Sequence, residues 1–461
     1  MKLTKPTISL FLAASLYGCG GGNNETPPST KTIKVIDGYL QSATVCIDTS
    51  FDGECNKVLG KTNANGEISI AQNHLDYPLI ATVTAGMSQD KDRVGYSTHS
   101  YSMTAPAGSE YITPFTTLAL QNNMEVPDVA LALNLEPSVI AGDYIALKES
   151  EMNQEAYRSH AAARGVALEL TEDLGSVDYT TLELAQHLTA AIDEFRDSIQ
   201  KPQELDKVDF VVRGDIIERE TVISDLQDHL IGEPGSTFWY EGSLHNPQQN
   251  QTGIMTSYFN ETEVCDITWG DDEFCDPYKV EQNRMEIFNG DFGSHSAEYL
   301  YLTNELSLLV YPDLNWGDLS APKIINFYTT TDITDYDNRL SFDADELTGR
   351  TFTRLLDVAR DETDSDVRLS HYTFINFNRE ENIGLVEVDG ISHSWKLEQT
   401  SPQRLTLVIL NDDNVVYHFS KVVDNPSLFI VVDDEVRDTN FSVFIQDEQL
   451  AQNLLKHWEQ A

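Results

Sequence analysis

The stretch Ser394–Ser420, SWKLEQTSPQRLTLVILNDDNVVYHFS, decides the fold class, because it contains three β-like runs joined by polar turns. Apolar and polar residues alternate in the first run and at the start of the second, as in a strand with one buried face. The connecting letters SPQ and NDDN are typical of turns. Similar aromatic-rich runs lie on both sides of this stretch. We therefore expect residues 236–461 to form an antiparallel β-sheet or barrel domain that ends in an amphipathic helix, about Asp447 to Glu459.

Short alternating runs also fill residues 32–112, where Asn65-Gly66 stands between two runs as a hairpin signal. Strand-like runs at this spacing, with turn residues between them, predict a small β-sandwich.

Residues 113–232 change to a helical period. Between Asp178 and Ile199 apolar residues recur every three or four positions, which predicts an amphipathic helix. Asp215 to Leu230 is a second helix candidate. The sequence thus predicts a mainly β protein with a helical middle segment that connects the sandwich to the larger β domain.

The composition is strongly acidic. The 461 residues include 75 Asp and Glu against 30 Lys and Arg, a formal net charge of −45. Binding to nucleic acid depends on Lys and Arg that neutralise phosphate, so we expect no nucleic acid partner. The charge favours either a solvated acidic coat or the recruitment of divalent cations.

The first residues are typical of an export signal. Lys2 and Lys5 precede the apolar run Pro6–Leu16, PTISLFLAASL, and small and polar residues follow it. This run is short for a bilayer span, so residues 1–18 are predicted to be a signal peptide. No later run is apolar over the length that a membrane-spanning helix needs.

The tetrapeptide Leu16-Tyr17-Gly18-Cys19 resembles the lipobox of bacterial lipoproteins, from which it departs at Tyr17. The resemblance implies that the Cys19 thiol is acylated and that Cys19 becomes the N-terminus, with membrane lipid as its partner. Several buried acyl chains anchor a protein stably where one does not. Gly20 in place of Asp implies the outer membrane by the sorting rule of that family. Residues 19–31, rich in Gly, Asn and Pro, are predicted to be the lipidated cysteine and a flexible tether.

The chain has five cysteines, and an odd count leaves one without a disulfide partner. Two local pairs, Cys46 with Cys55 and Cys265 with Cys275, would each close a short loop by a disulfide in an oxidising compartment. Cys19 is then the cysteine left for lipid.

Two further resemblances concern whole segments. The runs VIDGYLQSATVCIDTSFDGEC, TNANGEISI, TVTAGMSQD and APAGSEYITPFTTL resemble a module of surface lipoproteins of gammaproteobacteria, including the accessory colonisation factor type. Some members carry a gluzincin-type peptidase domain, but this chain has no H-E-x-x-H motif. The meander from Leu347 to Gln446 is similar to a lipocalin-like or other calycin-type barrel.

One loop has oxygen ligands at the spacing of the start of a calcium loop. These candidate calcium ligands are Asp48, Ser50, Asp52 and Glu54. Leu59 occupies the position where a closing Glu is usual. The alternative is an acidic surface turn closed by a disulfide.

No catalytic motif is present in the sequence. Four histidines of the C-terminal part show no zinc-ligand spacing, and they are His245, His295, His371 and His393. Four of the chain's five tryptophans either fill the core, stack on sugars or line an apolar pocket. They are Trp239, Trp269, Trp316 and Trp395.

We expect a non-catalytic binding or structural module of the outer membrane, facing the periplasm or the cell surface. Its partners would be an envelope or matrix polysaccharide or an envelope protein, in adhesion or envelope structure. The alternatives are a hydrolase of envelope or host glycans or peptides, and a calycin-like carrier of an apolar ligand.

Overall fold

The computed structural model describes fourteen stretches of the chain. They are residues 29–151, 153–170, 181–213, 216–232, 237–245, 254–267, 273–289, 293–312, 324–357, 367–401, 404–411, 414–425, 427–433 and 441–460. The signal peptide, Cys19 and most of the predicted tether lie outside them.

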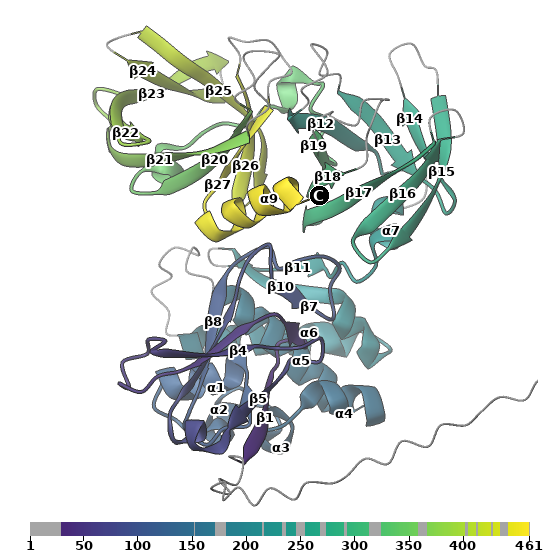
Figure 1. Ribbon diagram of the computed structural model, residues 1–461, viewed down its shortest axis with the longest axis vertical. Helices are drawn as coiled ribbons and strands as arrows, with labels where there is room; N and C mark the ends of the chain where they lie inside the picture. The colour runs from purple at the N-terminus through teal and green to yellow at the C-terminus, as the bar shows by residue number, and fades with distance from the viewer. Residues whose placement is uncertain are drawn as a thin grey trace, which may run out of the picture.

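The C-terminal part contains two closed antiparallel barrels of eight strands each, where the sequence indicated one β domain (Figure 1). The first barrel consists of β12 (Trp239–His245), β13 (Met255–Phe259), β14 (Glu263–Ile267), β15 (Glu273–Glu281), β16 (Arg284–Asn289), β17 (Gly293–Leu302), β18 (Leu306–Tyr311) and β19 (Ile324–Thr329). The second consists of β20 (Thr351–Asp357), β21 (Val367–Asn378), β22 (Ile383–Val388), β23 (Ile391–Ser401), β24 (Arg404–Asn411), β25 (Asn414–Asn425), β26 (Leu428–Asp433) and β27 (Phe441–Ile445). Both barrels are meanders in which each strand pairs with the next one along the chain.

Each barrel interior is filled with side chains because residues alternate inward and outward along every strand. In the first barrel, Trp239, Phe259 and Tyr299 belong to the interior cluster. In the second, Trp395 and Phe374 pack edge to face at 5.2 Å between ring centroids.

The outward faces of the two barrels pack against each other. Phe327 of β19 meets Phe441 of β27 with ring centroids 5.1 Å apart. Gly242 permits this approach, since a Cβ atom there would lie 2.5 Å from the Phe327 ring. The helix α9 (Glu448–Gln460) adds Leu450 and Leu454 to the same apolar cluster. The expected C-terminal helix is therefore present, and it lies on the side of the barrels that faces the N-terminal part (Figure 1).

The N-terminal module contains two main sheets whose apolar faces enclose one core, as expected for a small sandwich. The three-stranded sheet has the order β5 (Glu67–Ala71), β1 (Thr30–Val35), β9 (Tyr111–Ile112). The four-stranded sheet has the order β4 (Lys57–Lys61), β3 (Thr44–Ile47), β6 (Leu79–Val83), β8 (Tyr101–Ala105). The short strands β2 (Leu40–Gln41) and β7 (Gln89–Asp90) pair separately, and the 3-10 helix η1 (Gln72–Asp76) follows β5.

Helices follow the module and form a core of their own. They are α1 (Pro114–Gln121), α2 (Val126–Ala132), α3 (Pro137–Ile140), α4 (Tyr144–Glu151), α5 (Gln154–Glu169), α6 (Thr181–Ser198), η2 (Pro202–Lys207) and α7 (Leu226–Ile231). α1 begins with a capping box between Thr113 and Thr116. α6 confirms the predicted amphipathic helix, with Leu188 and Ile192 fully buried.

The expectation of a helix over Asp215 to Leu230 is wrong for its first part. Residues Ile216–Thr221, IIERET, form β11 and pair with β10 (Val208–Arg213) as an antiparallel hairpin. Only α7 is helical in this region. The region 113–232 therefore holds a β-hairpin as well as helices, because pairing with β10 overrides a weak local helix preference.

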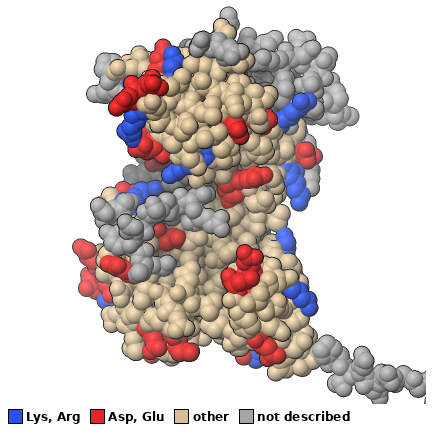
Figure 2. All heavy atoms as spheres, turned by 90° about the vertical axis from the view of Figure 1, so that its left-hand side faces the viewer, with Lys and Arg blue, Asp and Glu red and all other residues tan. Residues whose placement is uncertain are grey.

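The mainly β fold class is confirmed. The α8 helix (Ala344–Leu347) and η3 (Tyr336–Asn338) precede the second barrel. Within the described stretches, no helix has the length and apolar character needed to cross a membrane. Asp and Glu are distributed over the face in Figure 2 and are not confined to one patch.

Candidate functional site

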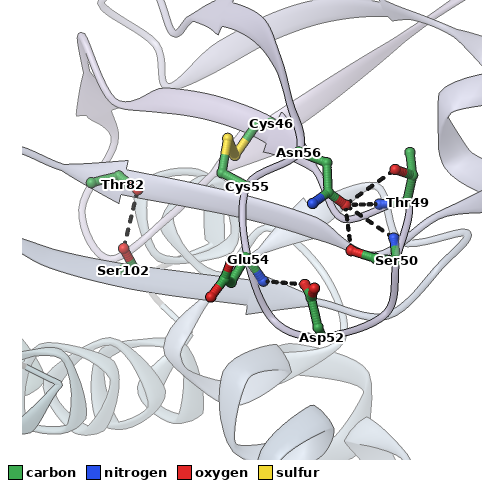
Figure 3. The surroundings of a disulfide bond; sticks show 9 residues. All are labelled: Cys46, Thr49, Ser50, Asp52, Glu54, Cys55, Asn56, Thr82 and Ser102. Carbon is green, nitrogen blue, oxygen red and sulfur yellow. Dashed lines mark hydrogen bonds between the residues drawn. A yellow bond between two sulfur atoms is a disulfide. The ribbon is translucent and has the colours of Figure 1, made fainter.

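The predicted calcium loop is closed by the Cys46–Cys55 disulfide (Figure 3), and backbone hydrogen bonds to the Asp48 carboxylate organise it. Asp48 is 3% exposed, its Oδ1 accepts from the N–H of Phe51 at 2.6 Å, and its Oδ2 accepts from the N–H of Gly53 at 2.8 Å. Burial acts to raise the pKa of Asp48, but these backbone hydrogen bonds outweigh it and lower the pKa. Asp48 thus serves as the internal acceptor of the turn.

Asp52 and Ser50, two of the other predicted calcium ligands, also have hydrogen-bond partners within the loop. The Asp52 Oδ1 accepts from the N–H of Glu54 at 3.0 Å, and the Ser50 hydroxyl donates to Asn56 at 2.8 Å. Within the described stretches, the carboxylate oxygens of Asp48, Asp52 and Glu54 do not all lie within 4.8 Å of one another.

Both predicted disulfides are present, Cys46–Cys55 and Cys265–Cys275. Glu273 lies beside the second one, and its carboxylate and the two sulfur atoms are within 4.8 Å of one another. The sulfur atoms are bonded to each other, so they are not thiolate ligands for a metal.

Two of the four tryptophans named above belong to the core. Trp239 is 1% exposed and donates to the Leu230 carbonyl oxygen, while Trp395 is fully buried and donates to that of Asn376. Neither offers a ring face to a sugar. Trp269 and Trp316 lie outside the described residues. The four histidines lie on four different strands, β12, β17, β21 and β23.

The first barrel also buries a polar group that the sequence did not indicate. Glu241 of β12 is 7% exposed, and its Oε1 accepts from Tyr311 at 3.3 Å and from Asn326. Burial and the neighbouring Asp266 raise the pKa of Glu241 to about 7.

A cavity of about 190 Å³ lies where the N-terminal module, the β10–β11 hairpin, the first barrel and the start of α9 meet. It combines charged groups with aromatic rings. The charged and aromatic residues that line it include Asp37, Asp90, Arg93, Tyr96, His99, Tyr101, Arg164, Asp209, Tyr301 and Asp447.

Two arginines and one aspartate form the central ion pairs of the cavity wall. Asp209 of β10 lies 2.7 Å from Arg93 and 2.9 Å from Arg164 of α5. Burial would raise the pKa of Asp209, but the two guanidinium groups outweigh it and hold this pKa below its usual range. The pairs join the N-terminal module to the helices and the hairpin.

The network continues behind this wall. His160 of α5 is fully buried, with Nε2 3.0 Å from Asp92 and Nδ1 3.2 Å from Asp206. Lys148 lies 3.1 Å from the same Asp206 carboxylate. Buried polar and charged groups need partners, and Lys148 and His160 share the Asp206 carboxylate.

Asp37 is the exception in the cavity wall. It is 6% exposed, and its Oδ2 accepts from the Tyr101 hydroxyl at 2.8 Å. Its Oδ1 is buried and has no hydrogen-bond partner in the described structure. Burial and the nearby Asp90 raise the pKa of Asp37 to about 8, so this carboxyl group is mostly protonated at neutral pH.

His99 adds a neutral group to the wall, since burial and Arg93 lower the pKa of its imidazole to about 4. Shifted pKa values and a hollow between parts of a protein are the usual marks of a small-molecule site.

The sequence carried only a faint signal of this site. The dipeptide Asp37-Gly38 is typical of a turn, but Gly38 is also required for a different reason. A Cβ atom there would lie 2.0 Å from Asp90 Oδ1, so the glycine lets the carboxylate pack on the backbone. The run Asp90-Lys91-Asp92-Arg93 interrupts the alternating pattern, but its partners come from distant helices and strands.

Compared with protein-family models, curated proteins and solved structures, the chain shows no significant match.

Proposed function

We propose that this chain is an outer-membrane lipoprotein that acts as a non-catalytic binding module, with the junction cavity as its small-molecule site. The observation that carries the binding role is the Asp37 carboxyl oxygen, which lies buried in the cavity wall without a partner. A buried polar atom without a hydrogen bond costs free energy, which a bound ligand would recover.

The anchor is supported by the cysteines. Cys46–Cys55 and Cys265–Cys275 account for four of the five, so Cys19 in the lipobox-like LYGC is left for acylation. The tether would hold the sandwich, the helices and the two barrels away from the membrane. Envelope polysaccharide or an envelope protein remains the proposed macromolecular partner of the outer surface.

The packing of the barrels favours this proposal over a carrier of apolar ligands. Large aromatic side chains such as Trp239 and Trp395 fill the interiors where a carrier would hold its ligand. The hydrolase alternative draws no support from the four histidines, which are distributed over four strands.

The anchor is tested by a Cys19→Ala variant of the full chain, expressed with its signal in a bacterium grown with labelled palmitate. We expect the wild-type protein to carry label and to sediment with outer membranes, and the variant to do neither. A Tyr17→Ala variant, which keeps the cysteine, is the matched control. A labelled or membrane-bound Cys19→Ala protein would show that this anchor is wrong.

The binding role is tested by native mass spectrometry of the full lipoprotein, extracted from membranes in detergent. We expect a small-molecule adduct that is lost on denaturation. If no adduct is found and no compound in a library of small polar molecules raises the melting temperature, the binding function is rejected.

A further inference from the structure

The charges around the cavity are unequal. Five carboxyl groups line it, those of Asp37, Asp90, Asp209, Glu220 and Asp447, against the three guanidinium groups of Arg93, Arg164 and Arg213. The site therefore has an excess of acidic groups over basic groups.

Three of the five carboxyl groups are fully engaged with partners inside the protein. Asp209 is paired with two arginines, as described above, and Glu220 is paired with Arg213. Asp447 accepts from the N–H of Leu450 in α9 and from the N–H of Ser100 in the sandwich. None of these three needs a ligand.

The remaining two acids are Asp37 and Asp90. Asp90 accepts from the N–H of Asp92 at 3.0 Å, and its other oxygen lies 3.6 Å from Arg93, beyond hydrogen-bond distance. Within the described stretches, the Asp37 carboxyl group accepts only from the Tyr101 hydroxyl. Burial and neighbouring carboxylates raise the pKa of both acids, which shows that their environment disfavours a second negative charge.

We propose that the cavity binds a small organic cation, whose ammonium group donates to the free Oδ1 of Asp37 beside Asp90. This inference rests on the proposed binding function and names the ligand class of that site. An ammonium group supplies up to three donors and a positive charge, which are what these two carboxyl groups lack. Tyr96, Tyr101 and Tyr301 line the same cavity, and aromatic rings attract organic cations.

The size and the donor set distinguish this ligand from others. A volume of about 190 Å³ corresponds to roughly six water molecules of liquid, which suits a compound of a few heavy atoms. A bare divalent metal fits less well, because no three carboxylate or imidazole ligand atoms in the described cavity wall lie within 4.8 Å of one another.

Binding of such a cation displaces a proton. Asp37 holds its proton at neutral pH, and the groups that face it are Asp90, Arg93, Arg164 and Tyr101. An ammonium group at Oδ1 favours the carboxylate, so the proton leaves as the cation enters. The apparent affinity should then rise about tenfold per pH unit until the pH approaches 8.

The test is isothermal titration of the full lipoprotein in detergent with ethylammonium chloride, and with sodium acetate as an anion of similar size. We expect ethylammonium to bind, acetate not to bind, and the heat at pH 7 to depend on the ionisation enthalpy of the buffer. Asp37→Asn should weaken ethylammonium binding at least tenfold. Asp76→Asn, an exposed aspartate of the same module, should not.

Each outcome decides the proposal. Acetate binding, or ethylammonium binding that is unchanged in Asp37→Asn, would overturn the cation assignment while the binding function stands. If neither ligand binds and the protein still carries a native adduct, the cation assignment is again overturned and the binding function stands. If neither ligand binds and no adduct is found, the binding function itself is rejected. If Asp37→Asn fails to fold, the pH dependence and the buffer dependence of the wild-type protein decide alone.

Discussion

The side-chain amide of Asn453 donates a hydrogen bond of 2.7 Å to the carbonyl oxygen of Ala85, and so joins the last helix to the N-terminal sandwich. His457, one turn further along α9, lies 2.9 Å from the Gly86 carbonyl oxygen. Asp447 at the start of the helix accepts from the N–H of Ser100. The helix that packs on the second barrel therefore also fixes the sandwich, and Asp447, just before the helix, lines the cavity.

Replacement of Asn453 by Leu removes the donor and leaves the Ala85 carbonyl oxygen buried without a partner. We expect the free energy of unfolding to fall by about 1–3 kcal/mol, the cost of one unsatisfied buried group. Urea denaturation measures it, and exposed Gln449→Leu in the same helix is the control. Equal midpoints for the two variants would show that the hydrogen bond from Asn453 to Ala85 does not stabilise the protein.

Arg164 is a second position where removal of one partner should be costly. It is 1% exposed, pairs with Asp209, and donates to the carbonyl oxygens of Leu205 and Val208. Arg164→Met would leave a buried carboxylate and two carbonyl oxygens without this partner. We expect the free energy of unfolding to fall by about 3–5 kcal/mol.

The control for Arg164→Met is Arg196→Met on α6, where the arginine is partly exposed and its ion pairs are with Asp193 and Asp197. This change should alter stability by less than about 1 kcal/mol. If both variants unfold at the wild-type urea midpoint, the buried network does not stabilise the junction.

The strands could be predicted because their signal is local. In Ser394–Ser420, residues such as Trp395 and Leu397 point inward and the turn letters separate the runs, so the meander followed directly. Closure of the two barrels was not predictable, because it depends on pairing between strands that are far apart in the sequence. β12 pairs with β19, for example Tyr240 with Thr329, and β20 pairs with β27. Alternation is the same in an open sheet and in a closed barrel.

The candidate site was beyond prediction for a related reason. Asp37, Arg93 and Asp209 are unremarkable acids and bases in a chain with 75 acidic residues, until the fold buries them together. The disulfides show the opposite case. Cys46 and Cys55 are close in sequence, so their pairing was readable from the chain.

Glu241 gives a pH prediction. Its pKa in the folded protein is about 7 against 4.5 ordinarily, because of burial and of Asp266. The stabilisation from its bound proton is complete below pH 4.5 and is lost as pH rises through 7. Glu241→Gln, which stays neutral and can still accept from Tyr311, should lack this decline and be more stable than wild type at pH 8, on the order of 1–3 kcal/mol.

Thermal unfolding from pH 4 to pH 8 measures the difference between Glu241→Gln and wild type. Exposed Glu286→Gln on β16 serves as the control and should follow the wild-type curve. A Glu241→Gln protein that parallels wild type over the whole range would mean that Glu241 is charged in the barrel at neutral pH.

The acidic loop at Asp48 gives a metal prediction. Because the Asp48 oxygens already accept backbone N–H groups, we expect about 1 mM calcium, a range used by extracellular modules, to change the melting temperature of wild type and Asp52→Asn equally. Any shared rise would come from the general negative charge. A rise that wild type shows and Asp52→Asn lacks would identify a calcium site in this loop.

The two disulfides should stabilise the protein to similar extents, because they close loops of similar length, with sequence separations of 9 and 10 residues. On the chain-entropy model, a loop of that size contributes about 2–3 kcal/mol by restricting the unfolded chain. The double variants Cys46→Ala/Cys55→Ala and Cys265→Ala/Cys275→Ala should each lose this amount in urea denaturation. The second disulfide joins β14 to β15, whose backbones are already hydrogen-bonded to each other. It should still stabilise the protein as much as the first, because a disulfide acts by restricting the unfolded chain. A much smaller loss for the barrel pair would show that native strand pairing, and not loop closure, determines its contribution.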